Sequence, residues 1–130
     1  MAGAYIDVGG GVTAYRYTAW DGQLLNLGGI WKRGPGLPGE DFSSRPSKVS
    51  DDGNVIGGQA FLAGPRKAFI WTPQSGMLLL TDYLTRNGVT AHNDWRLIEF
   101  VNYISPDGKT ILGSGLNSQG LVETFIVTRP

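Results

Sequence analysis

Hydrophobic and polar residues alternate along much of the chain with a period close to two rather than 3.6. The pattern is clearest in segments 14–18, 68–72 and 124–128, which read AYRYT, AFIWT and TFIVT. Aromatic and β-branched residues of this kind suit the pleated, half-buried surface of a sheet. The alternation therefore predicts a chain of short β-strands.

Tight turns are predicted between these strands at three Asp-Gly pairs, which lie at positions 21–22, 52–53 and 107–108. Each pair is flanked on both sides by apolar runs. Asp-Gly accepts the positive φ values that a two-residue hairpin demands. We therefore expect antiparallel strands on either side of each pair.

The strand pattern repeats along the chain. Segment 14–18 aligns with 68–72 at an offset of 54, and 68–72 aligns with 124–128 at an offset of 56. Upstream, VSDDGNVIGG (49–58) matches ISPDGKTILGSG at an offset of 55, and the offset of 56 matches Gly57 to Gly113. A period of roughly 55 over three blocks indicates internal repeats, with blocks at about 1–30, 44–84 and 96–130.

Each full block contains four predicted strands, so the fold class expected is all-β, with antiparallel, propeller-like blades. The chain begins inside a second strand and ends after a third, which gives about ten strands, or two and a half blades. At 130 residues, these form a single β-repeat domain over 1–130. The ends of such an incomplete set are unpaired sheet edges. We expect these edges to pair with another copy of the chain, which predicts a homo-oligomer.

One segment departs from the strand pattern, in the sequence TDYLTRNG at 81–88. It has an acid in its first turn, a base in its last turn and an Asn-Gly stop. We expect a short helix over 82–87, capped at its N-terminus by Thr81.

Composition and charge exclude several classes of protein. Eleven basic and eleven acidic residues leave a formal net charge of zero, which gives no general attraction for nucleic acid. No apolar run reaches the ~18 residues of a membrane helix, so no membrane insertion is expected. The chain has no cysteine, which excludes disulfides and thiolate metal sites. No cofactor is predicted.

The ordered motifs V-S-x-D-G-x-V-I-G-G, A-F-I-W-T and G-M-x-x-L, with the C-terminal segment from Trp95 to Thr128, resemble the bacterial HAF repeat. The resemblance covers about residues 13–128. Thr13, Lys67 and Glu123 stand where the family has its histidine. The resemblance implies an exported or cell-surface protein and supplies no catalytic residues. The N-terminal sequence MAGAYIDVGGG does not have the pattern of a secretory signal.

Candidate binding residues lie in the two long connections, 28–44 and 85–95. Both connections follow a fourth strand, so both should leave the same end of the sheet assembly. Aromatic side chains on such loops suit ligand binding. The predicted site consists of Trp31, Lys32, Arg33, His92, Asp94 and Trp95.

The single histidine allows a second interpretation of the 85–95 connection. His92 and Asp94 have the spacing of an acid–base or metal-ligand pair, but one histidine and one aspartate are too few for a tetrahedral metal site. A structural role for His92, as a loop residue capping the next strand, is the simpler expectation. The acidic turn at 50–54 likewise has too few oxygen donors for a calcium loop.

The sequence thus favours a noncatalytic binding or scaffold module, with a glycan or a protein as its ligand. The alternatives are a small hydrolase or metal-dependent enzyme that acts from the 85–95 connection, and a gene fragment with no independent function.

Overall fold

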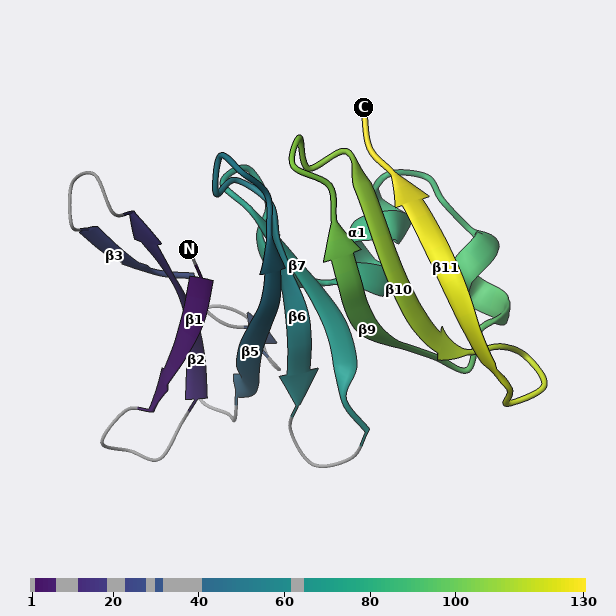
Figure 1. Ribbon diagram of the computed structural model, residues 1–130. Coiled ribbons are helices and arrows are strands. Elements are labelled where there is room, and N and C mark those ends of the chain that lie inside the picture. The colour runs from purple at the N-terminus through teal and green to yellow at the C-terminus, as the bar shows by residue number, and fades with distance from the viewer. Residues whose placement is uncertain (1, 7–11, 19–22, 28–29, 32–40, 62–64) are drawn as a thin grey trace.

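The computed structural model describes residues 2–6, 12–18, 23–27, 30–31, 41–61 and 65–130 (Figure 1). This part of the chain contains eleven strands, one α-helix and one short 3-10 helix. In chain order these elements are β1 (Ala2–Ile6), β2 (Val12–Thr18), β3 (Gln23–Asn26), β4 (Ile30–Trp31), β5 (Asp41–Val49), β6 (Ile56–Phe61), β7 (Lys67–Thr72), β8 (Gly76–Leu79), α1 (Leu80–Arg86), η1 (Ala91–Asp94), β9 (Leu97–Ile104), β10 (Thr110–Leu116) and β11 (Val122–Thr128).

The strands form three antiparallel sheets that follow one another along the chain. Their strand orders are β1-β2-β3, β4-β5-β6-β7-β8 and β9-β10-β11. The first sheet lies against β5, and β9 lies against β5, β6 and β7, so the middle sheet is covered on both faces (Figure 1). The expected all-β, antiparallel class with one short helix is confirmed.

The strands expected in the second and third blocks are present within a few residues of their predicted bounds. The structure adds β4, which pairs with the start of β5 through Ile30–Phe42 and Trp31–Asp41. The stretch 28–44, expected to be a connection, thus contains β4 and the start of β5. The helix starts two residues earlier than expected, and its N-cap is Leu79 with no side-chain cap, so the N-cap prediction for Thr81 was wrong. The Asp-Gly turn at 21–22 lies outside the described residues.

The turns after β5 and after β9 have the same atomic structure. In each turn the first serine and the aspartate two residues later are joined through their side chains. The serine hydroxyl also accepts from the amide at the start of the next strand, the aspartate accepts from the amide two residues on, and two backbone bonds close the loop. The glycines at 53 and 108 have φ of 74° and 73°. The internal repeat thus extends to individual hydrogen bonds.

In the second and third blocks, the pairing of the first strand with the second also skips a residue at an equivalent position. Pairing skips one residue of β5 at Ser47, opposite Gly57 and Gly58. Pairing skips Asn102 of β9 in the same way, opposite Leu112 and Gly113. The structural counterpart of Gly113 is therefore Gly58, at an offset of 55, and not Gly57. Each of these two glycines lies beneath the ring of a cross-strand phenylalanine, Phe69 or Phe125, where a larger side chain would collide.

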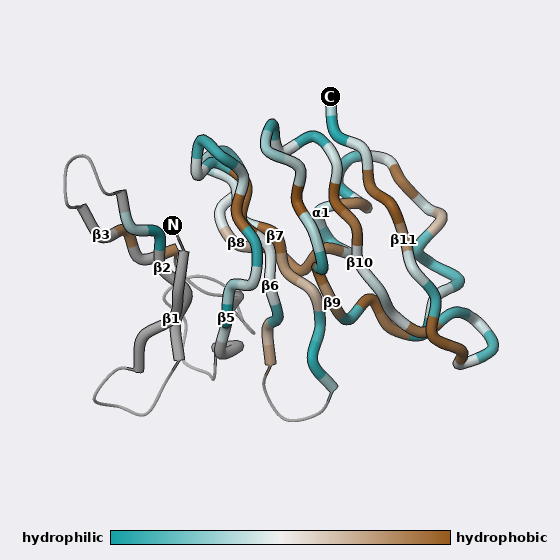
Figure 2. Tube along the Cα trace, viewed as in Figure 1, coloured by the Kyte–Doolittle hydropathy of each residue, from teal (hydrophilic) through white to brown (hydrophobic). Residues whose placement is uncertain are grey.

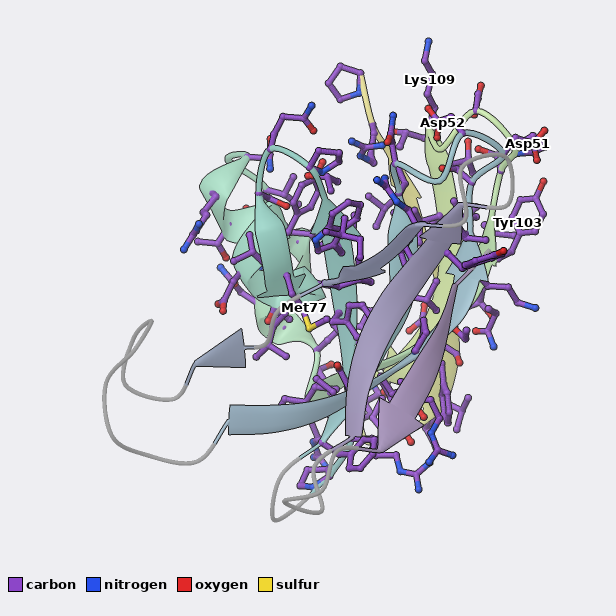
Figure 3. All side chains as sticks on the ribbon, turned by 90° about the vertical axis from the view of Figure 1, so that its left-hand side faces the viewer. Asp51, Asp52, Met77, Tyr103 and Lys109 are labelled. Carbon is purple, nitrogen blue, oxygen red and sulfur yellow. The ribbon has the colours of Figure 1, made fainter. Side chains whose placement is uncertain are left out.

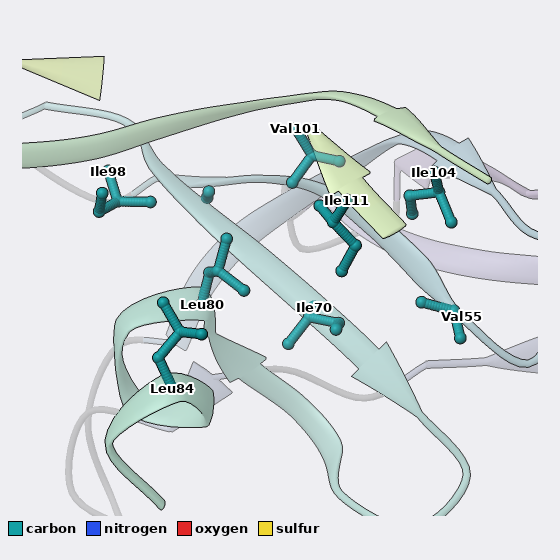
Figure 4. Packing of buried hydrophobic residues seen from close by; sticks show 9 residues of the cluster. Val55, Ile70, Leu80, Leu84, Ile98, Val101, Ile104 and Ile111 are labelled. Atoms are coloured by element: carbon teal, nitrogen blue, oxygen red, sulfur yellow. The ribbon is translucent and has the colours of Figure 1, made fainter. Parts of the chain in front are cut away.

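The hydrophobic core consists of two clusters, one on each side of the middle sheet. Ala68 and Ile70 of β7 belong to the cluster between the middle and last sheets, while Phe69 and Trp71 belong to the cluster on the other side. The larger cluster also receives Leu80 and Leu84 of α1 (Figure 4). Figure 2 shows the corresponding hydrophobic stretches along β7, β9, β10 and β11. Strand β7 is thus buried on both faces, as the exposed fractions of 0–6% for these four side chains confirm.

The repeated turns also connect one sheet to the next. The guanidinium of Arg16 on β2 donates to the carbonyl of Gly53 over 3.3 Å and lies 5.3 Å from the ring centre of Trp71. From the same turn, the Asp51 amide donates to the Pro106 carbonyl of the turn after β9 over 2.9 Å, and Figure 3 shows both turns at the same end of the molecule.

We predict that Gly108→Ala destabilises the protein far more than Gly88→Ala. Both glycines have positive φ, 73° and 79°, so each alanine adds about 1 kcal/mol of backbone strain. A Cβ on residue 108 would lie 2.7 Å from Cγ2 of Val55, whereas nothing lies within 4 Å at residue 88. Overpacking at residue 108 should add about 2 kcal/mol, measurable by urea unfolding. Equal losses in the two variants would show that the turn does not pack tightly on Val55.

We predict that the two turns make the free energy of unfolding depend on pH in the acidic range. Hydrogen bonds from the Asn54 amide and the Ser50 hydroxyl lower the pKa of Asp52, and bonds from Ser105 and the Lys109 amide lower the pKa of Asp107, both from an ordinary 3.8. A carboxylate with a lowered folded-state pKa stabilises the protein above its unfolded-state pKa, and the effect is lost as pH falls through the folded value. Unfolding free energies measured between about pH 4 and pH 2 should therefore decline less steeply in Asp52→Asn/Asp107→Asn than in the wild type. A decline as steep in the double variant as in the wild type would contradict the role of the turns.

Candidate functional site

The segment that follows β8 folds back over the end of the last sheet. Leu80 and Leu84 bury one side of α1 in the core. The helix ends at Arg86, with Asn87 as its C-cap, and the positive φ of Gly88 turns the chain so that the Val89 amide donates to the carbonyl of Leu84 over 3.0 Å. This turn brings η1, with residues 91–94, back alongside α1.

His92 lies in η1 with its side chain 9% exposed. Its Nε2 is 3.0 Å from Oγ1 of Thr85 on α1, and Thr85 in turn donates to the Thr81 carbonyl. Nδ1 of His92 is buried and has no hydrogen-bond partner among the described residues. The expectation that His92 is a loop residue capping the next strand was therefore wrong, since the ring joins η1 to α1.

Trp95 follows η1, and its half-buried side chain packs against the core rather than standing out from a loop. Its ring meets that of Phe125 edge to face, with 5.9 Å between ring centres and an interplanar angle of 86°. It lies against the cluster that contains Leu80 and Leu84. Trp95 thus fixes the connection to β11.

A cavity of about 390 Å³ lies between α1, η1 and the end of β11. Its wall is mainly apolar, and its polar side chains include His92 and Arg129. The β11 residues that line it are the consecutive positions 125–128. Because successive residues of a strand point to opposite faces, a cavity lined by both sets lies along the edge of β11.

The opposite side of this cavity is held by an interaction that the sequence does not indicate. Arg129 donates from Nε to the Tyr83 hydroxyl over 2.9 Å and from Nη1 to the Gly108 carbonyl over 2.8 Å, and its guanidinium lies 6.0 Å from the centre of the Tyr83 ring. These contacts tie the end of β11 to α1 and to the second repeated turn.

The structure brings together only part of the predicted site. His92 and Trp95 both line the cavity. Asp94 is exposed, and within the described part of the chain it makes no hydrogen bond to His92. Trp31 lies on β4, with its side chain outside the described set, and Lys32 and Arg33 fall outside the described residues.

No group of three or more histidine, aspartate or glutamate side chains gathers in the part of the chain that the structure describes. Neither of the described helices has the length and apolar character needed to cross a membrane. Comparison of the chain with protein-family models, curated proteins and solved structures finds no match.

We predict that Thr85→Val destabilises the protein by about 1 kcal/mol, because it removes the single hydrogen bond of the buried His92 ring. Urea unfolding measures the loss, and the ¹⁵N shifts of this sole histidine report the change at Nε2. Thr90→Val, at an exposed position before η1, is the matched control and should leave both unchanged. A stable Thr85→Val protein with an unaltered imidazole spectrum would contradict the contact.

Proposed function

We propose that the chain is a noncatalytic protein-binding module that takes an extended segment of a partner along the free edge of β11. The observation that carries this proposal is the cavity on that edge, which lies beside a strand paired on one side only among the described residues. Addition of a strand to an open sheet edge is a common way of binding peptides, in which main-chain bonds give affinity and pockets give specificity.

The middle sheet provides a precedent for the added strand. There, β8 pairs with β7 through residues 69–72. At the offset of 56 established by Phe69 and Phe125, the counterparts of these residues are 125–128 on β11. The edge of β7 that pairs with β8 in the middle sheet is thus equivalent to the edge of β11 that borders the cavity in the last sheet.

The cavity's lining supports a protein partner over a glycan. Sugars need many hydrogen bonds, whereas this wall is mainly apolar around Leu84, Val89 and Ile98. Its volume lies within the ~300–1,000 Å³ typical of ligand pockets. The segment proposed has an apolar side chain that enters the cavity and a polar group within reach of Nδ1 of His92. Because His92 bonds to Thr85 rather than to a carboxylate, the arrangement favours binding over catalysis.

The proposal extends to the larger architecture. We propose that the three sheets are blades of a propeller-like arrangement and that the chain is related to the HAF-repeat proteins. The identical turns and matching irregularities of the second and third blocks support an arrangement of equivalent blades. The face-to-face succession of sheets in Figure 1 is consistent with it.

We predict that a synthetic peptide with the sequence of residues 74–80, QSGMLLL, binds at β11. This segment contains β8, which pairs with the equivalent edge within the chain. Binding should shift the backbone amide NMR signals of residues 125–128 and the side-chain signals of His92. Ala91→Trp, which fills the cavity from its lining, should weaken binding by at least about tenfold, a change of about 1.4 kcal/mol.

Thr90→Trp is the matched control, since it adds the same side chain one residue away from the cavity lining, and it should bind the peptide like the wild type. No shift at 125–128, or equal binding by the Ala91→Trp variant, would contradict the proposed function.

A further inference from the structure

The outer face of the last sheet is apolar and uncovered. Directly paired residues of antiparallel strands place their side chains on the same face. The pairing of β9, β10 and β11 therefore defines three rows on the face turned away from the middle sheet, and none of their residues is charged. The rows are Tyr103–Leu112–Ile126, Phe100–Ser114–Thr124 and Leu97–Leu116–Val122.

Several side chains of this outer face are exposed although they are large and apolar. The exposed fractions are 81% for Val122, 67% for Ile126, 44% for Tyr103 and 39% for Phe100. Figure 3 shows Tyr103 directed away from the body of the molecule. A contiguous apolar surface of this kind commonly marks an interaction site.

The repeat shows what covers the equivalent face elsewhere in the chain. The counterparts of Leu112 and Ile126 in the middle sheet are Gly57 and Ile70, which pair with each other in the same way. Ile70 is only 1% exposed, and the missing side chain of Gly57 is replaced by Val101 of β9. The middle sheet thus buries this face against a neighbouring sheet, whereas Ile126 has no such neighbour within the described residues.

Polar side chains on this face of the middle sheet contact the neighbouring sheet, whereas within the described part of the chain their counterparts on the outer face of the last sheet do not. In the middle sheet, the Ser47 hydroxyl donates to the Val101 carbonyl over 3.0 Å, and the Gln59 amide donates to the Glu99 carbonyl over 3.4 Å, both on β9. The counterparts of Ser47 and Gln59 are Asn102 and Ser114. These two bond to each other over 3.1 Å instead. They occupy the positions from which the middle sheet reaches the backbone of its neighbour.

We propose that the outer face of β9-β10-β11 packs against a sheet of a second copy of the chain, as the middle sheet packs against β9-β10-β11. The equivalent face of the middle sheet is covered by the last sheet, which is itself a repeat of the same unit. We therefore expect the outer face of the last sheet to be covered by a repeat of that unit as well, supplied by the second copy. The absence of charge in the three rows matches such a face-to-face contact. The contact differs from the edge pairing expected from the sequence, and it goes beyond the proposed peptide binding.

The test is the molar mass of the full chain in solution. Light scattering or sedimentation should give a mass that rises above the 14.0 kDa of one chain as concentration increases through the micromolar range. Val122→Lys and Phe100→Lys each place an unpaired charge on the outer face at an exposed position. Each should raise the concentration needed for association by more than about tenfold.

Val89→Lys is the matched control, because Val89 is also an exposed apolar residue, at 37%, but lies outside the three rows. It should associate like the wild type, although it lies in the lining of the cavity and should impair peptide binding. A wild-type mass of one chain at all concentrations would overturn the proposal, as would association unchanged in both outer-face variants. Neither result would bear on the binding of the peptide to β11, which is measured separately.

Discussion

Burial of the middle sheet on both faces is the constraint on which the rest of the structure depends. On β7, Phe69 and Ile70 are adjacent in the chain, belong to different clusters and are each at most 1% exposed. Each side chain of this size contributes about 1.5–3 kcal/mol on full burial. Neither cluster can form without a second layer, so the first and last sheets are needed to hold the middle one. A one-residue slip of β7 would exchange the two clusters, which fixes the pairing of its neighbours.

The same relation between one sheet and the next explains where the two proposed binding surfaces lie. The last sheet repeats the turn, the irregular pairing and the glycine–phenylalanine contact of the middle sheet. It has no counterpart of β8 and no following sheet among the described residues. In the middle sheet, β8 pairs with the edge of β7, and the last sheet covers the face that contains Ile70. The equivalent edge and face at β11 are neither paired nor covered by described residues. The proposed peptide site and the proposed contact between copies both follow from that difference.

Local patterns predicted most of the strands, because alternation and Asp-Gly turns act over a few residues. They did not predict β4, since a strand of two residues is defined by its partner β5 rather than by its own sequence. They selected His92 and Trp95 for the site by residue type and by their place in a long connection. The cavity itself depends on contacts between distant segments, such as that of Arg129 with Tyr83, 46 residues apart. No local signal specifies such a contact. The alignment of Gly57 with Gly113 failed for a related reason, since the skipped residue in each first strand is visible only when the strands are paired.

The most direct test of this account compares the methyl groups of Ile70 and Ile126, which occupy equivalent positions on successive sheets. With isotope-labelled isoleucine and a soluble paramagnetic agent, methyl NMR measures the exposure of each residue to solvent as protein concentration rises. Ile70 should be protected at every concentration, while the Ile126 signal should be broadened in dilute solution and protected in concentrated solution. Equal protection of both at all concentrations, or an Ile126 signal that stays exposed throughout, would contradict the account.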